Sequence, residues 1–360
     1  MKIFEIIPHL QSGGGEKFVV DLTNKLAEMG HQCTLLSLYD PMPEDILREY
    51  ISAAVTKHSF AKRRGIDFRV MFAIARYIRR HRPDVVHLHL NAITYILLAA
   101  IVCRKTKFVA TIHSEASREA GTGINRAVRK LLFGLKLVTP VTISEESELS
   151  FERFYGYAAQ MVENGCVEYN LRSQSRWSEL RQGVDMLFLH AGRILGVKNQ
   201  LMLVRAFDAL IREGHSVRLV IAGRVADEQM FQQIKGYFSD NIVYVGEQSD
   251  IRQIMSVADG FCLSSLMEGM PITVIEAFSV GCVPVCTPVG GCVNMIEEGV
   301  SGFLSADTTE QQYVAALRRF VTATAEHRYA MSEKVKAEFV AKYSIDITAK
   351  NYLTIFGDEK

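Results

Sequence analysis

Short apolar runs alternate with amphipathic stretches along the first half of the chain. The runs KIFEII, CTLLSLY, DVVHLHL, FVATIH and VTPVTIS have the length and composition of buried strands. Between them, residues 16–29, 68–80 and 93–103 carry apolar side chains at helical spacing, and the first of these stretches stops at Gly30. Strands that alternate with helices predict a parallel sheet with helices on both faces.

The same alternation begins again after a polar stretch, residues 168–182, which is the best candidate for a linker. From residue 186 onwards the runs MLFLHAG, VRLVIAG, NIVYVG, GFCLSS and VPVCT alternate with helical stretches. We therefore predict an α/β protein with two Rossmann-like domains that face each other across a cleft. Because ligands of open α/β sheets bind beyond the carboxyl ends of the strands, we expect the site in this cleft.

The segment EGMPITVIE places two carboxylates, Glu268 and Glu276, eight positions apart across a predicted strand-to-helix turn. A carboxylate can accept paired hydrogen bonds from adjacent sugar hydroxyls, and amides near a helix start can donate to hydroxyls or phosphates. An acidic first turn that is favoured by the helix dipole would produce the same pattern. Taken alone, this pair of residues does not indicate a function.

Two further segments have the residue types of an anion site. In HAGRILGVK, Arg193 and Lys198 lie five positions apart after a strand and a glycine turn, as a diphosphate would require. Gly13, Gly14 and Gly15 open the first helix and permit close approach of the backbone to an anionic group. The alternatives are two solvated surface cations and a simple turn.

Together these segments resemble the family-4 glycosyltransferases. The two glutamates match the Glu-x7-Glu signature, the segment GRILGVK matches the phosphate clamp, and the glycine turn with Glu16 matches the N-terminal loop. Other family segments follow in the same order: DVVHLH, TIH with His113, Asn164-Gly165, and TPVGG with Gly290 and Gly291. The resemblance covers nearly the whole chain, down to a final helix near residues 345–356.

The resemblance implies a GT-B fold and retaining transfer of a sugar. Residues 1–170 would form the acceptor-binding domain and residues 171–340 the nucleotide-sugar-binding domain. In this family the last helix, here within residues 341–360, crosses back to the first domain. A UDP-sugar is the favoured donor, and the acceptor would be a saccharide or a lipid-linked saccharide in bacterial surface-polysaccharide synthesis.

The resemblance also implies a role for each matched residue. Glu276 would hold the ribose hydroxyls, and Arg193 and Lys198 would neutralise the diphosphate as it leaves. Glu268 and His113 would lie at the donor sugar. The catalytic candidates are therefore Arg193, Lys198, Glu268 and His113. Backbone groups would complete the nucleotide-sugar site at Gly14, Gly15, Gly269, Met270 and Pro271.

The reaction implied is substitution at the anomeric carbon through an oxocarbenium-like transition state. The leaving phosphate would accept the proton of the acceptor during front-face attack. We expect no cofactor and no metal site, because the sequence has no Asp-x-Asp and the Arg/Lys clamp can replace a divalent cation. His87 and His89 alternate along one strand and could mimic a ligand pair, although a structural role or a place in the cleft is the preferred interpretation.

Some competing functions lack the motifs that they require, and others of the same fold are kept as alternatives. A dinucleotide-dependent oxidoreductase requires G-x-G-x-x-G, but Phe18 stands where the third glycine belongs, and a P-loop is absent from the sequence. A nucleotide-sugar epimerase or phosphorylase and a non-catalytic nucleotide-sugar-binding protein remain as alternatives of the same fold. Donor turnover with a candidate acceptor would separate transfer from binding alone.

The uneven distribution of charge along the chain indicates a further partner. The chain has a net charge of +1, yet residues 57–136 hold 17 Lys and Arg against four Asp and Glu, or +13, which leaves −12 for the rest. Nucleic acid is a poor candidate because no aromatic residues are interleaved for stacking and the pI is only 7.6. We expect an anionic membrane surface as the partner, with a cytoplasmic protein bound peripherally to the inner face. The basic segments are residues 57–64 and 126–136.

Overall fold

The computed structural model describes residues 1–11, 13–169 and 176–357. The chain divides into two compact units, which we call unit 1 (Met1–Val167 with Tyr343–Lys360) and unit 2 (Glu168–Lys342). Each unit has one parallel sheet with helices on both faces, so the predicted pair of Rossmann-like domains is confirmed. Among the described residues, no helix is both long and apolar enough to cross a membrane.

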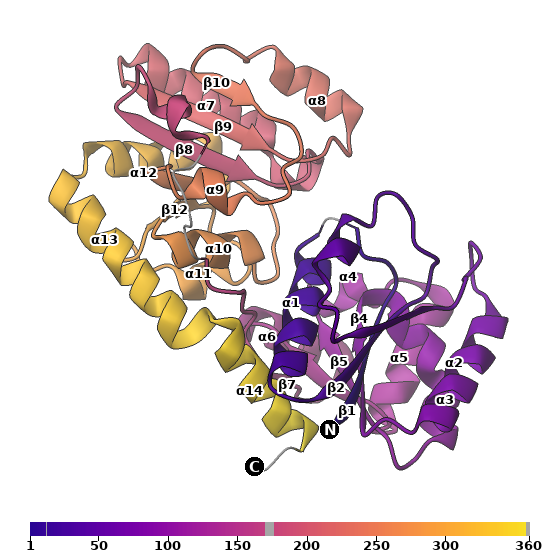
Figure 1. Cartoon of the computed structure of the whole chain (residues 1–360). Helices are drawn as coiled ribbons and strands as arrows, with labels where there is room; N and C mark the ends of the chain where they lie inside the picture. Colours follow the sequence, from indigo (N-terminus) through magenta and orange to yellow (C-terminus); the bar gives the residue numbers. More distant parts are fainter. Residues whose placement is uncertain (12, 170–175, 358–360) are drawn as a thin grey trace. The chain divides into compact units, whose positions relative to one another are not determined.

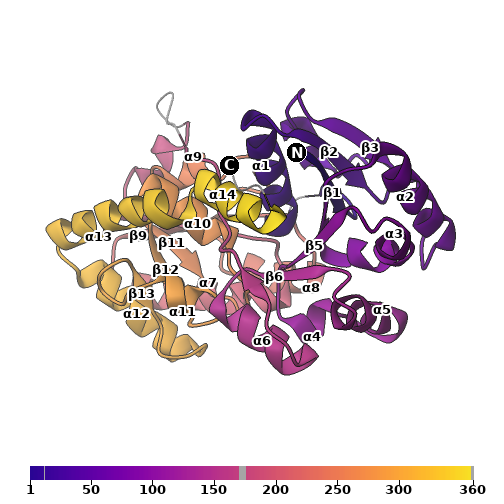
Figure 2. The same cartoon turned by 90° about the horizontal axis from the view of Figure 1, so that it is seen from below.

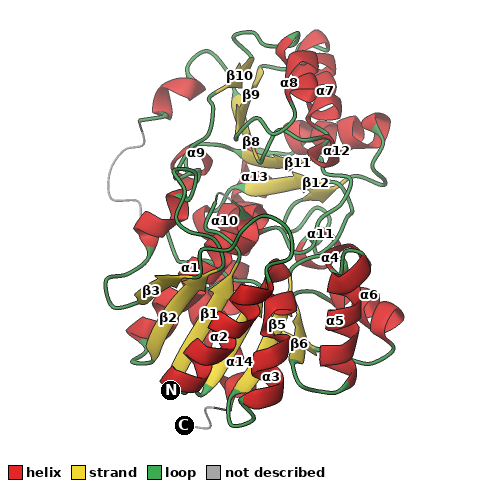
Figure 3. Cartoon of the chain, turned by 90° about the vertical axis from the view of Figure 1, so that its right-hand side faces the viewer, coloured by secondary structure: helices red, strands yellow, loops and turns green. Residues whose placement is uncertain are grey.

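Unit 1 is built on a seven-stranded sheet with the order β3-β2-β1-β4-β5-β6-β7. All neighbouring strands are parallel, and several can be followed as yellow arrows in Figure 3. Strands β2 and β3 extend the sheet on one side of β1, and β4 to β7 extend it on the other side. The strand order therefore switches between β1 and β4, which is the position where open α/β sheets bind ligands. The strands are β1 (Lys2–Ile7), β2 (Gln32–Ser37), β3 (Thr56–Ser59), β4 (Val85–His89), β5 (Lys107–Ile112), β6 (Thr139–Thr142) and β7 (Gln160–Met161).

Helices of unit 1 cover both faces of this sheet. On one face α2, α3 and α5 pack on a single apolar core, and on the other α1 lies beside the C-terminal helix α14 (Figures 1 and 2). The last helix therefore belongs to unit 1 although it follows unit 2 in the sequence. The helices are α1 (Gly14–Glu28), η2 (Leu90–Ile96), α2 (Phe68–His81), α3 (Leu97–Val102), α4 (Ala116–Glu119), α5 (Gly123–Gly134), α6 (Glu145–Tyr155) and α14 (Ile345–Phe356).

Unit 2 is built on a six-stranded parallel sheet with the order β10-β9-β8-β11-β12-β13. The strands are β8 (Met186–Ala191), β9 (Val217–Ala222), β10 (Ile242–Tyr244), β11 (Gly260–Leu263), β12 (Val283–Cys286) and β13 (Phe303–Leu304). The helices are η4 (Gly196–Lys198), α7 (Gln200–Arg212), α8 (Glu228–Lys235), α9 (Arg252–Met255), α10 (Ile272–Val280), α11 (Cys292–Met295), α12 (Glu310–Thr322) and α13 (Ala325–Glu338).

Two expectations about unit 1 are wrong in detail. The predicted helix over residues 93–103 begins as the 3-10 helix η2, and only its second part is α-helical. The apolar side chains at helical spacing in residues 68–80 were expected to face the sheet, but those of Phe68 and Phe72 are 60% and 66% exposed. The face that packs on the core instead carries Val70, Met71, Ile74, Ala75 and Ile78.

Candidate active site

In unit 2 the structure brings together two of the predicted residues, Lys198 and Glu268. Lys198 ends η4, just after β8, and Glu268 lies on the loop after β11. Strands β8 and β11 are neighbours in the sheet, so both side chains lie at its carboxyl edge. The Lys198 Nζ donates to Glu268 Oε1 over 2.6 Å, and Ser265 Oγ donates to the same oxygen over 2.5 Å. The ammonium is therefore fixed where ligands of such sheets bind.

A glycine turn supports the loop that carries Glu268. Gly290 has φ +55, and an added Cβ would lie within about 2.5 Å of the carbonyl oxygens of Glu268 and Gly269, far inside van der Waals contact. The Gly291 amide donates to the Gly269 carbonyl over 2.6 Å. Only glycine permits this close approach of two backbones. The turn TPVGG thus determines the position of residues 268–271.

Helix α10 carries the second glutamate of the signature. Pro271 precedes the first turn of this helix and Met270 is buried beside it. Glu276 lies on the second turn and is only 3% exposed, and glutamates are rarely buried unless they are paired. Its burial distinguishes it from the surface residue that an acidic first turn would have produced.

A buried pair that sequence reasoning missed holds the backbone of Arg193. His190 Nδ1 donates to the carbonyl of Cys262 over 2.9 Å, so its Nε2 accepts from Gln200 Nε2 at 3.2 Å. The same amide nitrogen donates to the Arg193 carbonyl over 2.9 Å. Burial lowers the pKa of His190 to about 4, which keeps the ring neutral. The Arg193 side chain itself is exposed and does not join the Lys198–Glu268 pair.

In unit 1 the glycine turn meets His113. Gly14 is the first residue of α1, and a Cβ added to Gly15 would lie 3.5 Å from His113 Nδ1. Gly15 therefore keeps open the side of the imidazole that carries Nδ1. The carboxylate of Glu16 folds back against Gly13, so a negative group already lies beside the start of this helix.

His113 is held through both its ring and its backbone amide. Its Nε2 lies 3.0 Å from His89 Nδ1, and its backbone amide donates to Glu119 Oε2 over 2.7 Å. The edge of the Phe18 ring packs against it with centroids 5.8 Å apart. Burial, together with the nearby His89, His87 and Arg129, lowers the pKa of His113 well below 6.5. The ring is therefore neutral at physiological pH.

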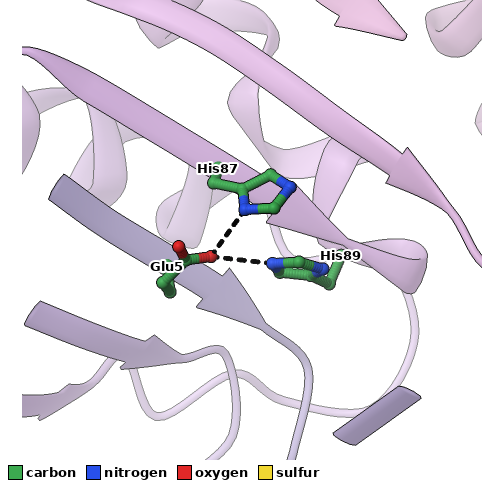
Figure 4. Close-up of side chains that lie close together, drawn as sticks. All are labelled: Glu5, His87 and His89. Atoms are coloured by element: carbon green, nitrogen blue, oxygen red, sulfur yellow. Dashed lines mark hydrogen bonds and ion pairs between the residues drawn. The ribbon is translucent and has the colours of Figure 1, made fainter. Parts of the chain in front are cut away.

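Behind His113 lies a fully buried cluster of Glu5, His87 and His89, drawn in Figure 4. Glu5 Oε2 lies 2.9 Å from His87 Nδ1 and 2.8 Å from His89 Nε2. Burial alone would raise the pKa of Glu5, but the charge and hydrogen bonds of the two histidines bring it down to about 2. Burial and the charge of His87 lower the pKa of His89 to about 4.

These three residues are of the types that hold divalent metals, and one ligand atom of each lies within 4.8 Å of the others. In the structure Glu5 Oε2 accepts a hydrogen bond from His89 Nε2 and lies 2.9 Å from His87 Nδ1, but His87 Nδ1 and Glu5 Oε1 are buried without a hydrogen-bond partner among the described residues. The sequence had singled out His87 and His89 but not Glu5. Its signal was a single charged residue within the otherwise apolar run IFEII.

Arg129 also differs from its expected role. It was counted among the surface cations of residues 126–136, but its side chain is 1% exposed. It pairs with Glu119 at 3.3 Å and donates to the Leu90 carbonyl over 2.7 Å. Leu90 has φ +55, a conformation that costs a non-glycine residue about 1–3 kcal/mol. Arg129 therefore stabilises the backbone at the start of η2, directly after His89.

Comparison with known proteins decides the family. The model for Glycosyltransferase Family 4 matches residues 12–165, and the model for Glycosyl transferases group 1 matches residues 172–338. The chain belongs to the family-4 glycosyltransferases. This glycosyltransferase is 22% identical to N-acetyl-alpha-D-glucosaminyl L-malate synthase of Bacillus anthracis, over 96% of this chain and 94% of the relative. It is 23% identical to a UDP-Gal:alpha-D-GlcNAc-diphosphoundecaprenol alpha-1,3-galactosyltransferase of Escherichia coli, over 70% of each chain.

Solved structures agree on the GT-B fold of this glycosyltransferase. A glycosyltransferase from Rickettsia africae superposes with a TM-score of 0.84 at 18% identity, covering 99% of this chain and 98% of the other. HepE of Anabaena in complex with UDP-glucose superposes with a TM-score of 0.83 at 17% identity, covering 99% and 100%. At such identities the likeness concerns the fold, and the substrates of this enzyme are a separate question.

Proposed function

We propose that this glycosyltransferase moves a sugar from a nucleotide-sugar, with UDP-sugars favoured, to a saccharide or lipid-linked saccharide acceptor in bacterial surface-polysaccharide synthesis. The observation that carries the proposal is the Lys198–Glu268 pair at the carboxyl edge of the unit 2 sheet, on a loop supported by Gly290. The Escherichia coli relative is named for transfer from UDP-galactose to a diphosphoundecaprenol-linked sugar, and HepE of Anabaena was solved with UDP-glucose.

In this proposal the chain's own cations take the role of a metal. Lys198 and Arg193 stabilise the negative charge that develops on the leaving diphosphate, so the reaction needs no cofactor. Glu276 accepts the ribose hydroxyls, and Glu268 with the backbone of Gly269, Met270 and Pro271 binds the donor sugar. These are the loop and helix that the Gly290 turn holds in place.

The bond changes follow from a retaining substitution. The bond between the anomeric carbon and the diphosphate oxygen breaks, and the acceptor hydroxyl oxygen forms the new bond on the same face. The departing phosphate oxygen takes the hydroxyl proton. In this proposal the amides of Gly14 and Gly15 bind the phosphate and His113 binds the sugar.

The proposal includes a cytoplasmic enzyme bound peripherally to the inner face of the cell membrane. Helices α2 and α5 pack on the same core of unit 1 and expose both cations and large apolar side chains. This combination suits an interface that offers anionic headgroups and acyl chains. The exposed cations are Lys57, Arg63, Arg64, Arg76, Arg79, Arg80, Arg126, Lys130 and Lys136, and the exposed apolar side chains are Phe68, Phe72, Ile124, Leu131 and Leu135.

Two cations of the predicted basic segments do not contribute to this surface. Arg129 is buried, as described above. Lys62 donates to the Tyr39 hydroxyl over 2.8 Å and to the carbonyls of Arg63 and Gly65, and its ammonium lies 4.5 Å from the Tyr39 ring centroid. Its charge is therefore committed to the fold rather than to a partner.

The test is a panel of nucleotide-sugars incubated with undecaprenyl-diphosphate-linked monosaccharides. Transfer of one sugar, with the anomeric configuration of the donor retained in the product by NMR, would support the proposal. Product with the inverted configuration would overturn the mechanism. Interconversion of nucleotide-sugars without any acceptor would indicate an epimerase instead.

A further inference from the structure

A line of buried hydrogen bonds connects Glu5 to the open side of His113. Glu5 Oε2 lies 2.8 Å from His89 Nε2, and His89 Nδ1 lies 3.0 Å from His113 Nε2. Glu5 and His89 are fully buried, so water does not compete for these contacts. The far nitrogen of the line, His113 Nδ1, faces Gly15.

The direction of each hydrogen bond follows from proton counting. An ionised carboxylate can only accept, so His89 Nε2 carries a proton. A neutral imidazole has one N–H, so His89 Nδ1 must accept and His113 Nε2 must donate. The neutral ring of His113 is then left with an unprotonated Nδ1. The low pKa of Glu5, about 2, and the lowered pKa values of His89 and His113 agree with these protonation states.

We propose that Glu5 and His89 are positioning residues that hold His113 in the tautomer whose Nδ1 is a hydrogen-bond acceptor for a hydroxyl of the donor sugar. Among the described residues, no group donates to His113 Nδ1, and Gly15 leaves the space beside it free of a side chain. In the opposite tautomer Nδ1 would carry the proton. It could then donate a hydrogen bond to the oxygen of a hydroxyl, but it could not accept one from the hydroxyl. This inference rests on the proposed function for the identity of the ligand, but the tautomer itself does not.

A second branch leaves the same carboxylate and serves as an internal control. Glu5 Oε2 also contacts His87, whose Nε2 lies 2.7 Å from Thr111 Oγ1. That hydroxyl lies 2.7 Å from the Tyr352 hydroxyl of α14. Loss of the Tyr352 hydroxyl would disturb a buried hydrogen bond of the same network without touching His89 or His113.

The first measurement uses the free enzyme and needs no donor. In protein labelled with 15N-histidine, two-bond proton–nitrogen correlations distinguish a protonated ring nitrogen from an unprotonated one, and His113→Gln assigns the signals. We expect a protonated Nε2 and an unprotonated Nδ1 for His113. A protonated Nδ1 in the wild-type enzyme would overturn the proposal outright.

Variants test the dependence on Glu5. The amide of Glu5→Gln can donate as well as accept, so both tautomers of His113 should become populated. In Tyr352→Phe the His113 signals should stay as in the wild type. Unchanged His113 signals in folded Glu5→Gln would contradict the role of the carboxylate. A stoichiometric metal ion in the wild-type enzyme that is missing from Glu5→Gln would also contradict it, because a metal would then orient the histidines.

Kinetics separate positioning from general damage. The loss of one well-placed hydrogen bond predicts a roughly tenfold lower kcat/KM for the donor in Glu5→Gln, while UDP, which lacks the sugar, should bind as in the wild type. Tyr352→Phe should keep the wild-type kcat/KM. An equal loss of UDP and donor binding in Glu5→Gln would argue for a structural effect and against the proposal. Failure of the wild-type enzyme to bind any nucleotide-sugar would instead count against the proposed function.

Discussion

At the scale of single residues, burial distinguishes Glu276 from most other glutamates of the described chain. Glu276 is 3% exposed on a helix that buries its neighbours, whereas most glutamates of the chain lie in solvent. Glu268 accepts hydrogen bonds from Lys198 and Ser265. A carboxylate is costly to bury unless it accepts hydrogen bonds, so each of these positions requires a donor, from the protein or from a ligand.

The first prediction concerns Glu276. Replacement by Ala should weaken UDP binding by about 1.5–3 kcal/mol, because the ribose hydroxyls lose a charged acceptor. Isothermal titration calorimetry measures the change. The control is Glu333→Ala, which removes an exposed glutamate of α13 that pairs with Lys336. Equal UDP affinity in Glu276→Ala and the control would remove Glu276 from the site.

The second prediction concerns Lys198. Lys198→Ala should lower kcat about 10²–10³-fold, the usual effect of removing a group that stabilises transition-state charge, with a smaller change in the KM of the acceptor. Arg193→Ala should act in the same direction. Steady-state assays with Lys235→Ala, an exposed lysine of α8, give the baseline. If EDTA abolished wild-type activity and manganese or magnesium restored it, the metal-free mechanism would fail.

At the scale of elements, turns decide where the predicted site residues lie. The loop after β11 and the turn before α11 approach each other so closely that a Cβ at Gly290 has no room. Likewise, Arg129 on α5 holds the strained Leu90 at the start of η2. Neither contact is visible in the hydrophobic pattern, because both depend on segments that are distant in sequence.

The third prediction concerns the turn at Gly290. Gly290→Ala combines an unfavourable φ with overlap onto two carbonyl oxygens, so it should destabilise the fold by about 1–3 kcal/mol or more and weaken donor binding. Gly299→Ala is the matched control, since Gly299 has φ +72 but nothing within 4 Å of an added Cβ. Thermal unfolding and donor titration compare the two. An identical Tm and donor affinity would show that backbone strain alone explains the effect.

At the scale of the whole molecule, charge is divided unevenly along the chain. Helix α2 exposes Phe68 and Phe72, which belong to no core, as well as Arg76, Arg79 and Arg80. An anionic membrane attracts nearby Lys and Arg by about 1 kcal/mol each, and apolar side chains add a contribution that salt does not screen. The electrostatic and the apolar contributions to membrane binding can therefore be tested separately.

The fourth prediction is that the enzyme sediments with vesicles in proportion to their anionic lipid content and is released in part by salt. The double variant Phe68→Ser/Phe72→Ser should bind less at every salt concentration, with unchanged stability, because both side chains are exposed in the free protein. Tyr329→Ser, an exposed aromatic of unit 2, is the control. Equal binding to neutral and anionic vesicles, or to neither, would refute an electrostatic membrane partner.

Periodicity was sufficient to predict the two Rossmann-like domains, and the resemblance to family 4 supplied the final helix near residues 345–356. Alternating apolar runs and amphipathic stretches are local properties, and they specify strand or helix wherever one face must be buried. The same patterns placed Glu268, Glu276, Arg193 and Lys198 on loops and helix starts. The similarity to family 4 then supplied the roles that remain to be tested.

Tertiary structure alone decided which side chains meet. Glu5, His89 and His113 lie on β1, β4 and the end of β5, and only the strand order brings them into one hydrogen-bonded line. Arg129 reads in the sequence as one more cation of a basic helix, and its burial depends on Glu119 and on the Leu90 carbonyl. Charge counted along a sequence ignores such partners, because desolvation and pairing arise only when distant segments pack together.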